Sequence, residues 1–145
     1  MAGYLTDLGR EKILNGNLIL SSSTLKIALL NNSSNLSKAT TYMSGLLSYE
    51  LSGTGYVGGH NGSGRKLVDN KSYGTINNVA YLSCDDITWP GLGAGVVAAV
   101  VLIKEGGLSD DTDTLVIGVD VFPPVETTGG SWTYQVSSSG LISFA

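Results

Sequence analysis

The run AGVVAAVVLI, at positions 94–103, carries no polar side chain in a chain of 145 residues. It is too short to cross a bilayer as a helix, which takes about 20 apolar residues. As a strand it has two apolar faces, because successive side chains point to opposite sides of a sheet. One face, with Val97, Ala99, Val101 and Ile103, is expected to join a protein core. The other face must also be covered.

We expect the second face to lie against another copy of the chain, or against a helix predicted at Asp7–Asn15. Charged residues make up only 14% of the sequence, against about 25% in typical soluble domains, which favours a surface partly covered by partners. The predicted partner is the chain itself, as a homodimer or homotrimer. The predicted oligomer interface consists of Val96, Ala98, Val100 and Leu102.

Turn residues recur between short apolar segments, which is typical of all-β folds. The sequence predicts strands at 24–30, 77–84, 94–104 and 114–122, a short strand in DITWP (86–90) that is stopped by Pro90, and two short closing strands around 138–140. The strand at 114–122 is expected to stop at Pro123 and Pro124, and segment 42–53 is compatible with a helical turn or a poor strand. We predict one antiparallel β-sandwich domain over residues 1–145, jelly-roll-like, with one short N-terminal helix.

The predicted helix has local signals at both ends. Thr6 is suited to cap its N-terminus, Asp7 favours the positive end of the helix dipole, and Gly16 is suited to end it. The segments 31–40 and 53–66 are predicted loops, and the second contains so many glycines that it is expected to be flexible.

Charge and targeting signals limit the classes of function. The net charge of −4 and the scattered basic residues argue against a nucleic-acid partner. A single cysteine, Cys84, excludes an intrachain disulfide. The N-terminal MAGYLTDLGREK lacks the pattern of a signal peptide, so we expect synthesis in a reducing compartment and no membrane partner.

No motif supports catalysis or cofactor binding. GTGYVG (53–58) matches a dinucleotide fingerprint, but GHNGSGRK follows it where a helix is required. His60, the only histidine, is interpreted as a solvated loop residue, and Cys84 is interpreted as a small core residue. The acidic run at 110–114, joined in space by Asp85, Asp86 and Asp120, leaves a structural cation open as an alternative to polar turns. We therefore expect no enzyme activity, no cofactor and no metal.

The order of several segments resembles a family of small tailed-bacteriophage virion proteins, the head decoration or capsid cement proteins. The resemblance covers 4–17 and 24–144. It is carried by YLTDLGREKILNG, TLKIALL, LSGTGYVGG, DDITWPG, AAVVLIKEG, TLVIGVDV and GGSWTYQVSSSGLISF. It implies a non-enzymatic structural protein with a β-sandwich, made in the cytoplasm of a host bacterium. Such a protein binds the major capsid protein on the outer surface of the phage head and stabilises contacts between capsomers.

The loops 31–40 and 53–66 are the predicted docking segments, since loops on a rigid scaffold carry recognition. Within the second loop, Tyr56, His60 and Arg65 are the predicted capsid contacts. The alternative function is a tail- or fibre-associated virion protein, either an adaptor or a receptor- or glycan-binding module. Trp89, Trp132 and Tyr134 would support glycan binding only if they lie on an exposed face.

Overall fold

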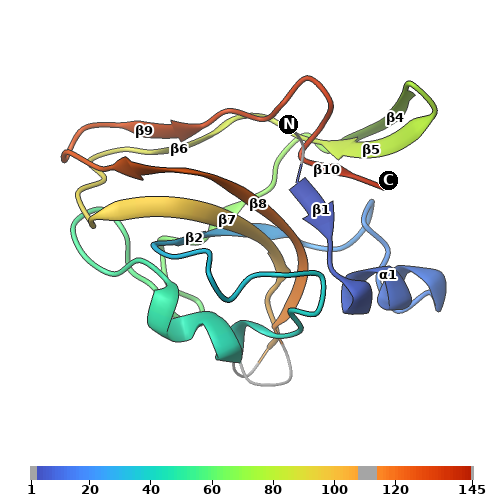
Figure 1. Ribbon diagram of the computed structural model, residues 1–145, viewed down its shortest axis with the longest axis horizontal. Coiled ribbons are helices and arrows are strands. Elements are labelled where there is room, and N and C mark those ends of the chain that lie inside the picture. Colours follow the sequence, from blue (N-terminus) through green and yellow to red (C-terminus); the bar gives the residue numbers. More distant parts are fainter. Residues whose placement is uncertain (1–2, 108–113, 145) are drawn as a thin grey trace.

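The structure, a computed structural model, describes residues 3–107 and 114–144 and consists mainly of β-strands, as predicted (Figure 1). Its strands are β1 (Gly3–Leu5), β2 (Lys26–Leu30), β3 (Lys66–Leu67), β4 (Ser72–Ile76), β5 (Val79–Ser83), β6 (Ile87–Trp89), β7 (Val96–Lys104), β8 (Leu115–Glu126), β9 (Trp132–Tyr134) and β10 (Ile142–Ser143). A mixed sheet has the strand order β3-β2-β7-β8-β1-β10-β5-β4, and β6 pairs with β9 in a separate two-stranded sheet. The prediction of a wholly antiparallel fold is wrong, because β1 pairs with β10 in the parallel direction. The two closing strands are present, but they belong to different sheets.

The predicted N-terminal helix is confirmed as α1 (Asp7–Leu14), with Asn15 as its C-cap. The Thr6 hydroxyl accepts a hydrogen bond from the Gly9 amide at 3.0 Å and donates one to the Val116 carbonyl at 2.7 Å. A Cβ atom on Gly9 would lie 2.7 Å from the Ile117 carbonyl oxygen, so only glycine allows this close approach to β8. One threonine therefore both caps the helix and fixes it to the sheet.

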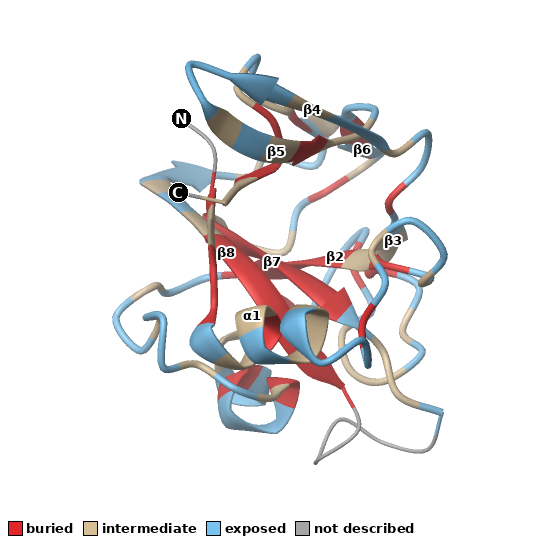
Figure 2. Cartoon of the chain, turned by 90° about the vertical axis from the view of Figure 1, so that its right-hand side faces the viewer, coloured by how far each residue is buried: buried red, intermediate tan, exposed pale blue. Residues whose placement is uncertain are grey.

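Both faces of β7 are covered by segments of the same chain. The strand lies between β2 and β8, and Figure 2 shows this centre of the sheet as buried. On one face, Val97, Val100 and Leu102 belong to the larger apolar core. On the other face, Ala99, Val101 and Ile103 form a second core, which also includes residues of a 3-10 helix, η1 (Met43–Tyr49). Segment 42–53, for which the sequence allowed either a helical turn or a poor strand, thus contains a helix that covers the second face of β7.

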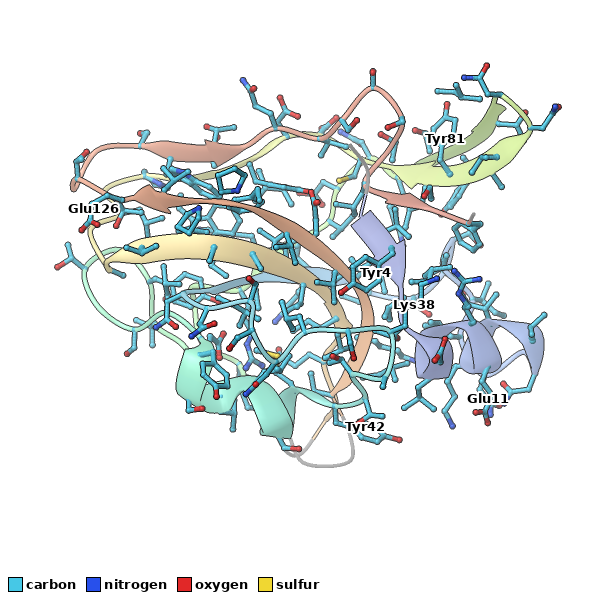
Figure 3. All side chains as sticks on the ribbon, viewed as in Figure 1. Tyr4, Glu11, Lys38, Tyr42, Tyr81 and Glu126 are labelled. Carbon is cyan, nitrogen blue, oxygen red and sulfur yellow. The ribbon has the colours of Figure 1, made fainter. Side chains whose placement is uncertain are left out.

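Partly buried side chains complete this second core: Tyr4 of β1 packs against it, together with Leu36 and Tyr49 (Figure 3). The helix α1 does not provide the cover, because its Leu8 and Ile13 pack against the larger core instead.

The predicted oligomer interface on β7 is wrong. Val100 and Leu102 are each 1% exposed and belong to the larger core, and Ala98 is also buried. Only Val96 remains partly exposed. A break in the β7–β8 register between Val97 and Ala99 shifts the alternation, so that Val97 faces the same core as Val100. A simple period of two along the sequence cannot reveal such a bulge.

The strand β8 continues through its two prolines instead of ending before them. In the β7–β8 ladder, Ala99 pairs with Val121 and Val97 pairs with Val125, so Pro123 and Pro124 fall within the irregular stretch. A proline lacks the backbone N–H of a regular ladder position and is tolerated at a bulge.

We expect Val100→Asp and Val101→Asp each to prevent folding or to lower the free energy of unfolding by about 4 kcal/mol, because each places an unpaired carboxylate in a different core. Val121→Asp, on the exposed part of β8, should change it by less than about 1 kcal/mol. Urea denaturation followed by circular dichroism measures all three variants. A stable, folded Val101→Asp protein would contradict the cover by η1.

Candidate docking surface

The glycine-rich loop 53–66 is held in place by its own backbone. The Gly53 and Tyr56 peptide groups exchange hydrogen bonds of 3.0 and 3.1 Å, and the Gly64 amide donates to the Val57 carbonyl at 3.0 Å. The loop lies beside the edge of β2 beyond β3, where the Leu29 amide donates to the Tyr56 hydroxyl at 3.1 Å and the Leu29 carbonyl accepts from the Leu51 amide at 3.0 Å. The expectation of a flexible loop is therefore replaced by a compact segment that covers a sheet edge.

A buried network of charges anchors this loop. The Arg65 guanidinium donates to both carboxylate oxygens of Glu50: Nε donates to Oε2 at 2.9 Å, and Nη2 donates to Oε1 at 2.8 Å. Its other terminal nitrogen donates to Glu105 at 2.7 Å, and Glu105 also pairs with Lys26 at 2.7 Å. The side chains of Arg65 and Glu50 are 0% and 2% exposed. This four-residue charge network joins the loop to η1, to β2 and to the residue after β7.

Tyr56 fills the space beneath the loop. A Cβ atom on Gly64 would lie 2.5 Å from the Tyr56 ring, so the glycine allows the backbone to cross the ring closely. The Tyr56 hydroxyl donates to Glu50 at 2.8 Å. Burial, and then the negative charge of Glu50, raise the pKa of Tyr56, so this phenol stays protonated as a donor.

Opposing influences act on the pKa of Glu105. Burial alone would raise it, but hydrogen bonds from Lys26, Arg65 and the Asn61 amide, with the positive charge of Lys26, lower the pKa below its ordinary value. The network therefore favours an ionised carboxylate at neutral pH.

The three predicted contact residues of the loop have internal roles. Tyr56 and Arg65 are buried, so their prediction as capsid contacts is wrong. His60 is half-buried, and its Nε2 donates to the Gly106 carbonyl, which ties the loop tip to the end of β7. In place of these side chains, the loop presents Val57, which is 59% exposed.

Three glycine-rich turns meet beside Val57. The Gly93 amide donates to the Thr54 carbonyl at 2.9 Å, the Gly129 amide donates to the Leu92 carbonyl at 2.8 Å, and the Thr127 amide donates to the Gly95 carbonyl at 3.0 Å. We call the surface formed by residues 52–57, 90–95 and 127–131 the loop end; it lies at the left of Figure 1. None of these residues is Asp, Glu, Lys or Arg. The loop end thus has no charged side chain of its own and is held by backbone hydrogen bonds, with the exposed Glu126 adjoining it at the end of β8.

The other predicted docking loop, 31–40, lies across the second face of the sheet and leads into η1. The Lys38 carbonyl accepts from the Asp7 amide at 2.7 Å, and the Tyr49 carbonyl accepts from the Asn31 amide at 2.8 Å. Many of its side chains are polar and exposed. It contributes to the cover of the second core and does not share a surface with the loop end.

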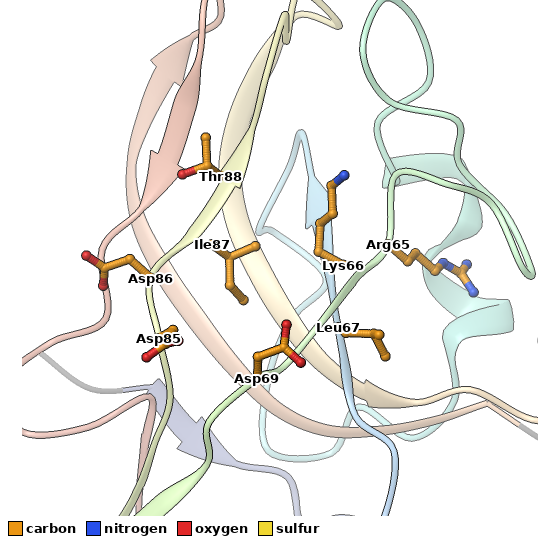
Figure 4. Close-up of a pocket in the computed structure, with 8 residues that line it drawn as sticks. All are labelled: Arg65, Lys66, Leu67, Asp69, Asp85, Asp86, Ile87 and Thr88. Carbon is orange, nitrogen blue, oxygen red and sulfur yellow. The ribbon is translucent and has the colours of Figure 1, made fainter.

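A cleft of about 470 Å³ lies between β3 and the strand β6 (Figure 4). Asp69, Asp85 and Asp86 line it, and Asp86 accepts a hydrogen bond from the Val136 amide at 2.8 Å. Within residues 3–107 and 114–144, no three His, Cys, Asp or Glu residues lie close enough together to hold a metal ion. Asp120 contacts Tyr134 instead, and positions 110–113 of the acidic run lie outside the described residues.

The aromatic residues weighed for glycan binding are mostly buried. Trp89 and Tyr134 lie in the larger core, whereas Trp132 is partly exposed in a groove of about 800 Å³. The Phe122 ring lies tilted against Trp132, with 6.2 Å between the ring centroids and 35° between the ring planes. Burial raises the pKa of Asp120 at the base of this groove, while the hydrogen bond from Tyr134 partly offsets that effect. The exposed face of three rings that glycan binding would require is therefore absent.

Glu50, Glu105 and Lys26 were missed by sequence reasoning. Glu50 interrupts an apolar stretch, and Glu105 comes after Lys104, two residues beyond the apolar run that ends at Ile103. A carboxylate so close to buried strands needs a partner, and Arg65 is the cation within the long glycine-rich loop. These two facts were available in the sequence, but the pairing across 40 residues between Arg65 and Glu105 was not.

Comparison of the chain with protein-family models, curated proteins and solved structures found no match. Among the described residues, neither helix is long and apolar enough to cross a membrane. The functional interpretation therefore depends on the geometry of the chain itself and on the resemblance of its segments.

We expect Arg65→Met to lower the free energy of unfolding by about 4 kcal/mol, because it leaves the Glu50 carboxylate buried without its cation. The double variant Arg65→Met, Glu50→Gln should recover part of this loss, since it removes the unpaired Glu50 charge while Glu105 keeps its pairing with Lys26. Lys66→Met serves as the neighbouring control and should change stability by about 0.5 kcal/mol. Equal losses in the single and double variants would show that the charge pairing is not the cause.

The lowered pKa of Glu105 predicts a pH dependence. A carboxylate with a lowered folded-state pKa contributes stability above its unfolded value, 4.5, and this contribution is lost as the pH falls through the folded value. The stability difference between the wild type and Glu105→Gln should therefore be largest near pH 7 and shrink steadily below pH 4.5. Thermal or urea unfolding at several pH values measures it, and a constant difference would contradict the assignment.

Proposed function

We propose that this chain is a non-enzymatic virion structural protein, a decoration or cement protein that binds the outside of an assembled phage head. The observation that carries the proposal is the loop end, an uncharged surface whose shape is fixed before any partner binds. The resemblance of the segments to phage head decoration proteins supplies the identity of the partner, the major capsid protein. The protein is made in the cytoplasm of a host bacterium and resides on the outer surface of the virion.

The mechanism is stabilisation by binding. A protein that binds only the assembled lattice shifts the equilibrium toward the assembled state by mass action. A surface held by backbone hydrogen bonds loses little conformational entropy on docking, so more of the contact energy appears as affinity. Because Tyr56, His60 and Arg65 of loop 53–66 make contacts within the protein, we assign recognition to Val57, to neighbouring backbone groups and to shape.

The same proposal includes the finer architecture. The two-stranded sheet of β6 and β9 contributes Ile87, Trp89 and Tyr134 to the core that also holds Val100 of β7. This arrangement supports a β-sandwich of the jelly-roll type, in which β6 and β9 begin the second layer. A β-sandwich would hold the loop end rigidly against a capsid surface.

The alternative is a tail- or fibre-associated virion protein that acts as an adaptor or binds a glycan receptor. The groove beside Trp132 and Phe122 favours it, since an aromatic face and the nearby Asp120 carboxylate suit a sugar ring and its hydroxyl groups. The burial of Trp89 and Tyr134 makes this platform small, so we place it second.

We expect Val57→Asp to weaken binding to purified heads that lack this protein by about tenfold or more, because it introduces a charge into an apolar contact. Ile19→Asp is the matched control: Ile19 is 55% exposed, close to the 59% of Val57, and does not belong to the loop end. Co-sedimentation with the heads measures both variants. Equal binding by wild type and Val57→Asp would remove the loop end from the interface.

Quantitative mass spectrometry of purified virions provides the second test. We expect the number of copies per major capsid protein to be one or a simple fraction of one, as lattice-wide binding requires. A few to a few dozen copies per particle would instead place the protein at the tail, neck or fibre. Absence from virions would overturn both functions.

A further inference from the structure

The strand β4 forms an unprotected edge of the large sheet. At the opposite edge, β3 is only two residues long and begins with Lys66, and the remaining edge of β2 is covered by residues 49–51 and by Tyr56 of loop 53–66. The part of β8 beyond its pairing with β1 carries Pro123 and Pro124. Short length, lysine, proline and a covering loop are the usual means of blocking an edge strand. The strand β4, of five residues, has none of them.

The backbone groups of Tyr73 and Thr75 point away from the sheet. The Phe144 amide donates to the Ala80 carbonyl at 2.9 Å, and the Leu141 amide donates to the Leu82 carbonyl at 2.7 Å, so Ala80 and Leu82 direct their backbone groups toward β10. Their partners across the β4–β5 pair are Thr75 and Tyr73. In an antiparallel pair, opposite residues direct their groups either both inward or both outward. Those of Tyr73 and Thr75 therefore face outward from the edge.

The hairpin that carries this edge is firmly shaped and uncharged. Its turn residues, Asn77 and Asn78, have φ angles of 51° and 64°, the left-handed conformation that two-residue hairpin turns require. No charged residue occurs from Ser72 to Cys84. The hairpin projects from the molecule and is mostly exposed (Figure 2), with Tyr81 on its surface (Figure 3). Tyr73 is 50% exposed.

We propose that β4 is a homodimerisation edge, which pairs in the antiparallel direction with β4 of a second copy about a two-fold axis at Gly74. In this register Tyr73 of one copy lies opposite Thr75 of the other, and each such pair exchanges both backbone hydrogen bonds through its outward groups. Ser72 lies opposite Ile76, so all five residues of the strand are paired. The two large sheets join into one continuous sheet.

The second copy is favoured over another protein strand by self-complementarity. A two-fold axis needs a surface whose outward groups match when the strand is reversed, and Tyr73 and Thr75 lie symmetrically about Gly74. Each tyrosine then faces a threonine, an aromatic with a β-branched partner, which is a favourable cross-strand pair. The absence of charge from the hairpin means that two identical copies meet without repulsion.

Sedimentation equilibrium of the full chain tests this proposal. An interface built on one short strand is small and therefore weak, so the protein concentration in the experiment should be raised to about 1 mM. The wild type should approach twice 15.0 kDa as the concentration rises. Thr75→Lys places two like charges beside the axis, and Thr75→Pro removes an outward N–H without removing a bond to β5; both should remain monomeric. Thr128→Lys, an exposed threonine of the loop end, should dimerise like the wild type.

Hydrogen exchange of individual amides gives a second readout that is independent of mass. The Tyr73 and Thr75 amides should exchange rapidly in dilute protein and become protected as the concentration rises, whereas the Gly74 amide, directed toward β5, should be protected throughout. Circular dichroism confirms that each variant is folded. A Thr75→Lys protein that still dimerises overturns the proposal. A wild type that stays monomeric at the highest concentration also overturns it, and would indicate that β4 pairs with a strand of another protein.

Discussion

The ion pair between Arg65 and Glu50 is the contact on which the shape of the loop end depends. Neither side chain has water to solvate it, so each requires the other, and Glu105 with Lys26 completes the balance of charge. A buried ion pair often adds little net stability compared with apolar residues of the same shape, but it admits few alternative geometries. Here it selects one path for a loop in which glycine would otherwise permit many. Tyr56, the edge of β2 and the position of Val57 all follow from that path.

The coverage of the apolar run is the second constraint. A strand with two apolar faces needs two cores, and a chain of this length can supply both only if a connecting segment folds back over the sheet. The segment from 31 to 49 does so, with Met43 and Leu46 facing Val101 and Ile103. The low content of charged residues is explained in part by this internal cover, without a partner on β7. Association must use another surface, such as an edge strand, which offers backbone hydrogen bonds instead of an apolar face.

Local signals in the sequence predicted local structure well. Thr6 and Gly16 bracket α1, and the alternating segments became β2, β5 and β8. The errors arose where a distant contact decides the outcome. The register break between Val97 and Ala99, with its extra residues on β8, places Val97 in the same core as Val100, and the conformation of η1 depends on the core beneath it. Arg65 looked like a contact residue because it is a charge in a glycine-rich loop, but its partners are 15 and 40 residues away.

The loop end and the β4 edge are separate surfaces, and this separation matters for how the protein could work. In Figure 1 the loop end lies at one end of the molecule and the β4–β5 hairpin at the other. Pairing through β4 would therefore leave both loop ends of a dimer free. Two joined copies bind a repeating lattice with an effective concentration that a single copy lacks, so weak contacts at each loop end combine into stable attachment, provided that the spacing of lattice sites matches the dimer. A short uncharged strand, too weak to hold a dimer at low concentration, would then act mainly where the lattice brings copies side by side.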